Sequence, residues 1–232
     1  MKKLLIRYPL ARRLLYPVRP TAQDVTEFWD YMCSRHGVTV IDEADPKQAR
    51  IVDGVLDAMG VFGKHEFRKH YSTTVLSSFR GIYIPFKPGV LCEDYDLWQQ
   101  MRVCVHEIDH VTQADLKREL GYSWDYLTNH ASRAAYEGDA FRSDVEMEWR
   151  YRGRLLYPYV LSIRLIHYNC TSLDCENIEK KLEDCMPVIK SDTLTEPASK
   201  EAAVWLDERY GRACPSPQPR PAVPAKYAIR AS

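Results

Sequence analysis

Two histidines one helical turn apart restrict what this chain can fold into. Residues 103–111 read Val-Cys-Val-His-Glu-Ile-Asp-His-Val, so His106 and His110 lie among apolar residues on nearly every side. In an α-helix, residues i and i+4 project from one face. Burying two imidazoles and a carboxylate is costly unless they are paired or bind a metal. The chain must therefore fold around a helix that carries a polar site.

The segment around the histidines has helix signals that do not depend on the histidines themselves. Asp96 is a favourable N-cap residue, and Gln99 stands where a capping box places its partner. Gly121, directly after Leu120, predicts the helix end. We therefore expect one long helix over 97–120, followed by a short loop that contains Gly121 and Tyr122.

The rest of the chain predicts a mostly helical α+β domain. Residues 71–79 and 81–86 are rich in β-branched and aromatic residues and predict one or two strands. The fold expected is a mostly helical domain with a small antiparallel sheet before the histidine helix. Residues 155–168 fit either a helix or a strand. Further helices are expected from Thr21, over 46–59, from about 128 to 152, over 174–186 and over 197–210.

Charge and proline content divide the chain into three parts. Residues 1–20 form a basic arm, 21–211 a single domain, and 212–232 a proline-rich tail that we expect to be disordered. The 32 Lys and Arg balance the 32 Asp and Glu. Zero net charge argues against a protein that coats nucleic acid or an anionic membrane. Nucleic-acid binding would depend on the arm alone and is not expected.

The expected compartment is the cytoplasm. Arg7 interrupts the only apolar stretch that resembles a signal peptide, and no apolar run reaches the length of a membrane span. The seven cysteines are odd in number and predict reduced thiols. The cluster of Cys170, Cys175 and Cys185 lacks the spacing of a zinc knuckle.

His106, Glu107 and His110 form a His-Glu-x-x-His pattern, which is typical of zinc hydrolases. Both imidazoles can reach one ion, and Glu107 can hold and deprotonate a water at that ion. A third protein ligand is needed, with a fourth position left for water. The metzincin extension is excluded, because Gln113 and Leu116 stand where it requires Gly and His.

The third ligand must come from beyond the histidine helix. Asp115 lies on the same helix and cannot fold back onto an ion held by His110. The candidates beyond this helix are Asp125, His130, Glu137 and Asp139. Glu137, which stands inside the next expected helix, is the strongest of them.

Glu137 is favoured by its small neighbours. Ala134, Gly138 and Ala140 would allow two helices to approach closely, which brings a short carboxylate arm to a metal on the neighbouring helix. A glycine inside a helix costs about 1 kcal/mol relative to alanine, so Gly138 suggests a packing reason. The alternative, a surface ion pair with Arg133, would leave these small residues unexplained.

The whole pattern resembles the gluzincin arrangement of zinc metallopeptidases, and in particular small bacterial and phage-type zincin domains. Those domains carry His-Glu-x-x-His-x-x-Gln followed by a Tyr-Glu-x-x-Ala-like helix, which Gln113 and residues 136–140 match. The resemblance covers about residues 70–152. It implies a peptidase in which His106, His110 and Glu137 hold Zn²⁺ and Glu107 is the general base. Its partner would be a peptide or protein substrate.

The chain departs from the thermolysin-like pattern at one position. Phe141 stands where those enzymes have an aspartate that orients a metal-bound histidine. Support for the histidines must come from elsewhere, and the candidates are Asp139, Asp144 and Asp109.

Two further roles are left with several candidates. The donor that stabilises the tetrahedral oxyanion would be one of several tyrosines and histidines. A strand before the zinc helix would offer an open edge to an extended substrate, and Pro85 fits an edge strand; a plain core strand is the alternative. The oxyanion candidates are Tyr126, His130, Tyr136, His167 and Tyr168, and the edge-strand residues are Ile82, Tyr83 and Ile84.

Two other functions fit the same residues. One is a zinc hydrolase of a non-peptide amide. The other is a zincin fold that has lost catalysis and serves as a binding or structural module. Glu107 partly distinguishes a catalytic site from a fold that has lost catalysis, because a site without catalysis has no need of the base.

Overall fold

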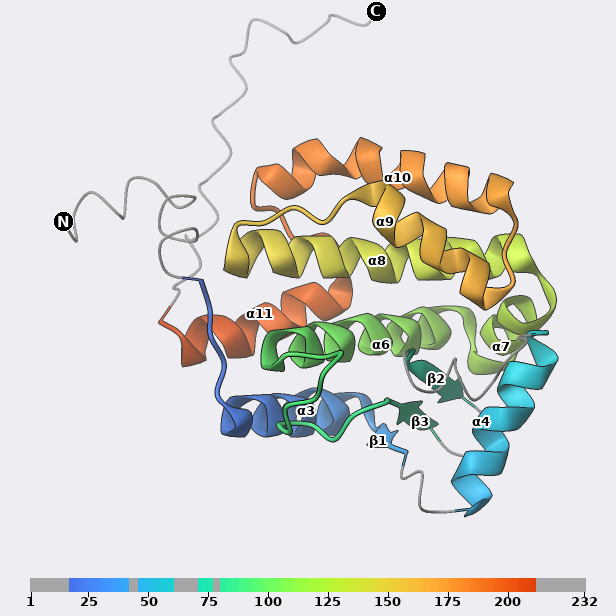
Figure 1. Cartoon of the computed structure of the whole chain (residues 1–232), viewed down its shortest axis with the longest axis horizontal. Coiled ribbons are helices and arrows are strands. Elements are labelled where there is room, and N and C mark those ends of the chain that lie inside the picture. Colours follow the sequence, from blue (N-terminus) through green and yellow to red (C-terminus); the bar gives the residue numbers. More distant parts are fainter. Residues whose placement is uncertain (1–16, 42–45, 61–70, 77–79, 212–232) are drawn as a thin grey trace, which may run out of the picture.

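The computed structural model describes residues 17–41, 46–60, 71–76 and 80–211 (Figure 1). The proline-rich tail at 212–232 and most of the basic arm lie outside the described residues. The last residues of the arm are packed: Val18 is buried, and its N–H donates to the carbonyl of Tyr151 at 3.2 Å.

Helices make up most of the described chain, as the sequence predicts. Figure 1 shows α3, α6, α8 and α10 stacked one above another, with α11 beside α6. The helices are α3 (Ala22–His36), α4 (Pro46–Ala58), α6 (Leu97–Lys117), α7 (Glu119–Thr128), α8 (His130–Arg152), α9 (Pro158–Ser162), α10 (Ser172–Lys190) and α11 (Pro197–Arg209), with a 3₁₀ helix η1 at Ile163–Tyr168.

Capping explains several helix starts. Thr21 accepts from the N–H of Asp24, whose carboxylate accepts in return from the N–H of Thr21, which completes a capping box. Asp96 and Gln99 form the same arrangement at the start of α6, as expected. Gly153 ends α8 in the left-handed conformation, also as expected. Within the ambiguous stretch 155–168, residues 158–168 are helical.

The predicted end of the histidine helix is wrong. α6 ends at Lys117, because Arg118 adopts a positive φ of 66°, and α7 begins directly afterwards at Glu119. Gly121 lies inside α7 rather than in a loop. The glycine costs the helix only about 1 kcal/mol, and α7 buries Tyr122 and Tyr126, which offsets that cost.

The sheet is mixed rather than purely antiparallel, and its strand order is β1-β3-β2. β3 (Arg80–Tyr83) pairs antiparallel with β2 (Thr73–Leu76) and parallel with β1 (Thr39–Val40). The edge-strand prediction is therefore wrong. Ile82 and Tyr83 belong to the central strand, and they are buried together with Ile84. The outer strand beside α6 is β2.

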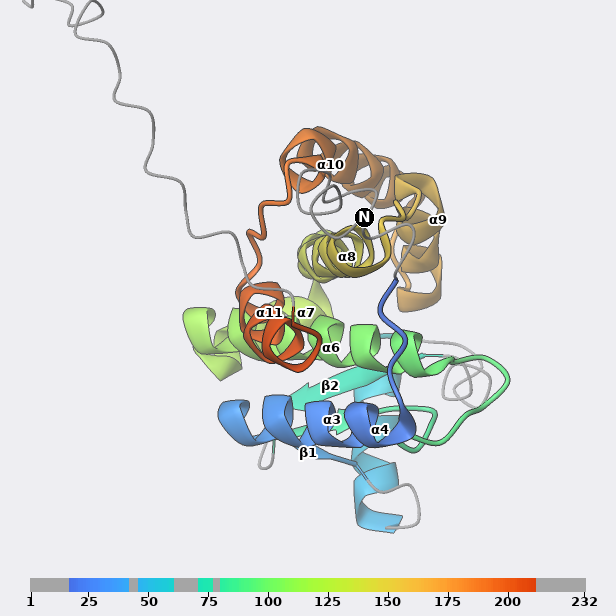
Figure 2. The ribbon, with the colours of Figure 1, turned by 90° about the vertical axis from the view of Figure 1, so that its left-hand side faces the viewer.

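The main core lies between α3, α6, α11 and the sheet, as Figure 2 shows from the side. The indole N–H of Trp29 donates to the carbonyl of Gln100 at 3.1 Å and ties α3 to α6. A second apolar cluster joins α8 to α9, η1 and α10. This packing fixes the face that α6 presents to α8.

None of the described helices is both long and apolar enough to cross a membrane. The described cysteines are free thiols, as expected, and Cys214 lies outside the described residues.

Candidate metal centre

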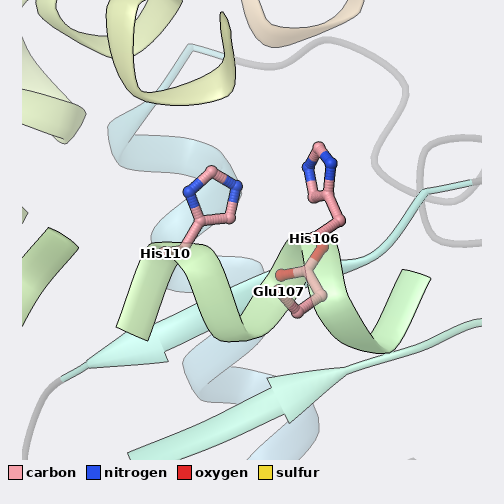
Figure 3. A group of neighbouring side chains, drawn as sticks. All are labelled: His106, Glu107 and His110. Atoms are coloured by element: carbon pink, nitrogen blue, oxygen red, sulfur yellow. The ribbon is translucent and has the colours of Figure 1, made fainter. Parts of the chain in front are cut away.

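The two histidines and the glutamate of the motif lie together on α6. His106, Glu107 and His110 are buried, and each offers one ligand atom within 4.8 Å of the others. Figure 3 shows both imidazoles on the same side of the helix, with the Glu107 carboxylate beside them. The imidazole centroids are 5.0 Å apart. The spacing of one turn thus places both rings over one point, as the motif predicts.

Glu137 reaches this point from α8. Its Oε2 lies 3.4 Å from Nε2 of His106, and its Oε1 lies 3.3 Å from Nε2 of His110. The carboxylate is buried, and Oε2 makes no hydrogen bond. Tyr126 on α7 donates its hydroxyl to Oε1. One carboxylate therefore faces the Nε2 atoms of both histidines.

The sequence predicts that Gly138 lets the helix of Glu137 approach the histidine helix, and this part of the prediction is wrong. Gly138 does not face α6. A Cβ at this position would lie 2.8 Å from Cδ1 of Ile178, which belongs to α10. The glycine therefore allows α8 to pack closely on α10, and this contact sets α8 from the side opposite to the histidines.

The Nδ1 atoms of both histidines face acceptors. Nδ1 of His106 lies 3.2 Å from Oδ2 of Asp144, and Nδ1 of His110 lies 3.1 Å from Oε1 of Gln113. Gln113 donates its Nε2 to the carbonyl of Tyr136 at 2.9 Å, which directs its oxygen towards His110. A proton on each Nδ1 satisfies both contacts. The Nε2 lone pairs are then left for an ion, an arrangement common in metal sites.

The charges around the histidines favour a cation. Burial by itself raises the pKa of Glu137, but His110 and His106 hold that pKa well below its ordinary value. Burial lowers the pKa of His106, whereas Asp144 and Glu137 raise it well above its ordinary value. Burial also lowers the pKa of His110, and Glu137 outweighs that effect. These carboxylates would stabilise a positive metal ion in the same space.

Glu107 is held by the sheet. Thr74 in β2 donates its hydroxyl to Oε2 of Glu107 at 2.6 Å and lies 3.2 Å from the backbone carbonyl of Glu107. The remaining carboxylate oxygen is not engaged by Thr74. Glu107 is therefore oriented by β2, while Glu137 is oriented by α7 and α8.

Of the acidic residues proposed to support the histidines, the structure brings only Asp144 to them. Asp139 forms an ion pair with Lys181 at 2.6 Å. Asp109 accepts from the N–H of Ala198, at the start of α11, at 3.3 Å. Asp144 reaches His106 because it lies two turns beyond Glu137 on α8 and so shares its helix face.

The other ligand candidates have partners elsewhere. Asp115 pairs with Arg80 at 2.8 Å, and Asp125 lies 3.9 Å from Nζ of Lys117. His130 is half exposed and pairs with Asp174 at 2.7 Å. None of these three residues lies within ion-pairing distance of the motif histidines.

Three of the oxyanion candidates also have other partners. Tyr126 donates to Glu137, and Lys117 donates to the hydroxyl of Tyr136 at 2.7 Å. His130 is engaged by Asp174. Tyr168, from η1, instead lines a cavity together with His106.

The donor set fits a transition metal such as zinc. Two imidazole nitrogens and one carboxylate are the ligands of catalytic zinc sites that keep an open position. The buried Oε2 of Glu137, which makes no hydrogen bond, is the observation that supports this fit. Such an atom is costly in an apolar interior unless a cation or a donor reaches it.

Sequence reasoning missed Thr74 and Tyr122. Tyr122 places its hydroxyl 3.2 Å from Nδ1 of His110. The strand prediction includes Thr74, but no local pattern shows that its side chain reaches Glu107, 33 residues later. The sequence predicts a loop at Tyr122, whereas the structure places it on α7, which packs against α6.

No family model matches the chain, and comparisons with curated proteins and with solved structures likewise return no match. The function proposed below therefore rests on the geometry and chemistry of these residues.

Proposed function

We propose that this chain is a zinc-dependent metallopeptidase. The observation that carries the proposal is the meeting of three side chains at one point: Nε2 of His106 and Nε2 of His110 lie 3.4 and 3.3 Å from the two carboxylate oxygens of Glu137. His106, His110 and Glu137 would hold the ion. When bound, Zn²⁺ polarises a carbonyl and lowers the pKa of a water molecule that it binds.

The protein's own residues would do the remaining work. Glu107 accepts a proton from the attacking water and delivers it to the leaving nitrogen. Thr74 holds one carboxylate oxygen of Glu107 and so fixes the direction of the other. Asp144 and Gln113 hold the imidazoles in the tautomer that directs Nε2 inwards.

Tyr168 is suited to donate to the developing oxyanion. Burial raises the pKa of its phenol well above the ordinary value, and the carboxylates of Glu137 and Glu107 raise it further. The hydroxyl therefore keeps its proton at neutral pH. Because Tyr168 lines the cavity beside His106, a substrate carbonyl placed there would lie within its reach.

Two features favour catalysis over a purely structural metal. The protein supplies three ligands, as in catalytic zinc sites, whereas structural sites have four. A base stands beside them, held by its own hydrogen bond from Thr74. β2 is one of the two outer strands among the described residues. It runs next to Glu107 and would offer main-chain groups to an extended peptide.

The test is peptide cleavage, read by mass spectrometry on a mixed peptide library. We expect the zinc-loaded protein to cleave, chelation to stop cleavage, and Zn²⁺ to restore it. Glu107→Gln should keep stoichiometric zinc and lose at least about 100-fold in rate. Glu176→Gln, the same change on the exposed side of α10, is the control and should cleave normally. A zinc-loaded wild type that cleaves no peptide would contradict the proposal, as would a Glu107→Gln variant that cleaves equally well.

A further inference from the structure

A cavity of about 240 Å³ opens directly beside His106. It lies between α6, α8 and η1, and Tyr71, Tyr95 and Tyr168 contribute aromatic walls. Ligand pockets for whole small molecules run from about 300 to 1,000 Å³. The cavity is therefore sized for one residue of a longer ligand whose remainder lies outside it.

Two arginines line this cavity. Arg102 stands one turn before His106 on α6, and Arg164 comes from η1. Nε of Arg102 lies 3.8 Å from Oδ1 of Asp144 and makes no hydrogen bond. Arg164 has no hydrogen bond or ion pair with any residue in the described part of the chain. Arg164 therefore keeps donors that a ligand can use, and Arg102, held beside Asp144, adds its positive charge behind them.

The position of Arg164 is also visible in its effect on the cavity walls. Burial raises the pKa of Tyr71 and of Tyr168, and the Arg164 guanidinium opposes that rise at both phenols. Burial raises the pKa of Asp144, and Arg102, His106 and Arg164 together lower it below its ordinary value. The charge of Arg164 thus acts on side chains from three sides of the cavity.

Two acids line the same cavity, and only one of them is engaged with the histidines. Asp144 gives Oδ2 to Nδ1 of His106 and faces Arg102 with Oδ1. Asp94, from the loop before α6, also lines the cavity.

We propose that this cavity is a specificity subsite for a substrate residue that carries a carboxylate, recognised by Arg164 with Arg102 behind it. Guanidinium groups bind carboxylates through paired, planar N–H donors, and they do so more specifically than lysine. The inference rests on the proposed function in that the bound residue would adjoin the scissile bond at the metal. The carboxylate comes either from an Asp or Glu side chain or from the C-terminus of the peptide.

Binding, rather than cleavage, is the primary test. The protein is the full chain carrying Glu107→Gln, loaded with Zn²⁺. The probes are fluorescein-labelled alanine octapeptides with Glu or Gln placed at each position in turn, all C-terminally amidated. A second pair has only alanine and ends in a free acid or an amide. Fluorescence anisotropy gives the Kd of each peptide.

We expect one Glu peptide, or the free-acid peptide, to bind about tenfold more tightly than its neutral counterpart. Which pair shows the preference identifies the source of the carboxylate. Adding Arg164→Gln should abolish the preference while leaving the neutral peptides unchanged. Arg154→Gln, an exposed arginine outside the cavity, is the matched control and should keep it.

Equal affinity for acidic and neutral peptides in every pair would overturn the proposal, as would an equal loss in the Arg164 and Arg154 variants. Failure of the proposed function has a different signature. In that case the wild type cleaves nothing, but the carboxylate preference and its dependence on Arg164 persist in the binding assay.

Discussion

Replacement of Glu137 by glutamine should remove most of the zinc affinity. Metal binding to structural zinc sites is worth about 10–16 kcal/mol, or about 2.5–4 kcal/mol for each of four ligands. Both oxygens of Glu137 face histidine Nε2 atoms, so the substitution removes one whole ligand charge. A neutral amide oxygen retains part of the contact. We therefore expect an increase in Kd of about 100-fold, which corresponds to roughly 2.8 kcal/mol.

The same substitution should also reduce the thermal stability that zinc confers on the protein. At a free zinc concentration 100 times the wild-type Kd, the metal stabilises the wild type by about 2.7 kcal/mol. For a variant with a 100-fold weaker Kd, the same zinc contributes only about 0.4 kcal/mol. Zinc should thus raise the Tm of the wild type clearly and that of Glu137→Gln barely.

The control is Asp139→Asn, which makes the same charge change two residues further along α8. Asp139 pairs with Lys181 and is directed away from the histidines, so its substitution should leave zinc affinity within about threefold. The measurements are metal content by elemental analysis, competition with a chelator of known affinity, and Tm with and without zinc.

One result would refute the assignment of the third ligand. Glu107 lies in the same cluster as the histidines. If Glu137→Gln kept wild-type zinc affinity and Glu107→Gln lost it, then Glu107 would be the ligand rather than the base. The proposed mechanism would fail with it.

Three further predictions follow from the surroundings of the site. Asp144→Asn removes the acceptor for Nδ1 of His106 and should weaken zinc binding about 10- to 100-fold, measured by chelator competition. Thr74→Val leaves the ligands intact, so zinc content should be unchanged while kcat falls about tenfold; a change in zinc content instead would show that β2 supports the metal. Gly138→Val places methyl groups against Ile178, 2.8 Å from the added Cβ, and should lower the free energy of unfolding by about 1–3 kcal/mol in urea, with Ile178→Ala restoring part of the loss.

The local parts of the fold and site could be predicted from sequence because their causes are local. The helix that carries His106 and His110 follows from capping at Asp96 and from its apolar pattern. The one-turn spacing then places both imidazoles on one face. Glu137 could be named as a candidate because it stands on the next long helix, but the distance between two helices is not encoded in either one.

The tertiary structure decided what depends on packing between distant segments. The turn at Arg118 created α7 where a loop was expected, and α7 supplies Tyr122 and Tyr126 to the site. The strand expected at the sheet edge is central, and β2 holds Glu107 instead, because pairing partners are set by the whole chain. The helical period alone determined that two histidines share a face, whereas the packing of α8 between α6 and α10 determined that a carboxylate meets them there.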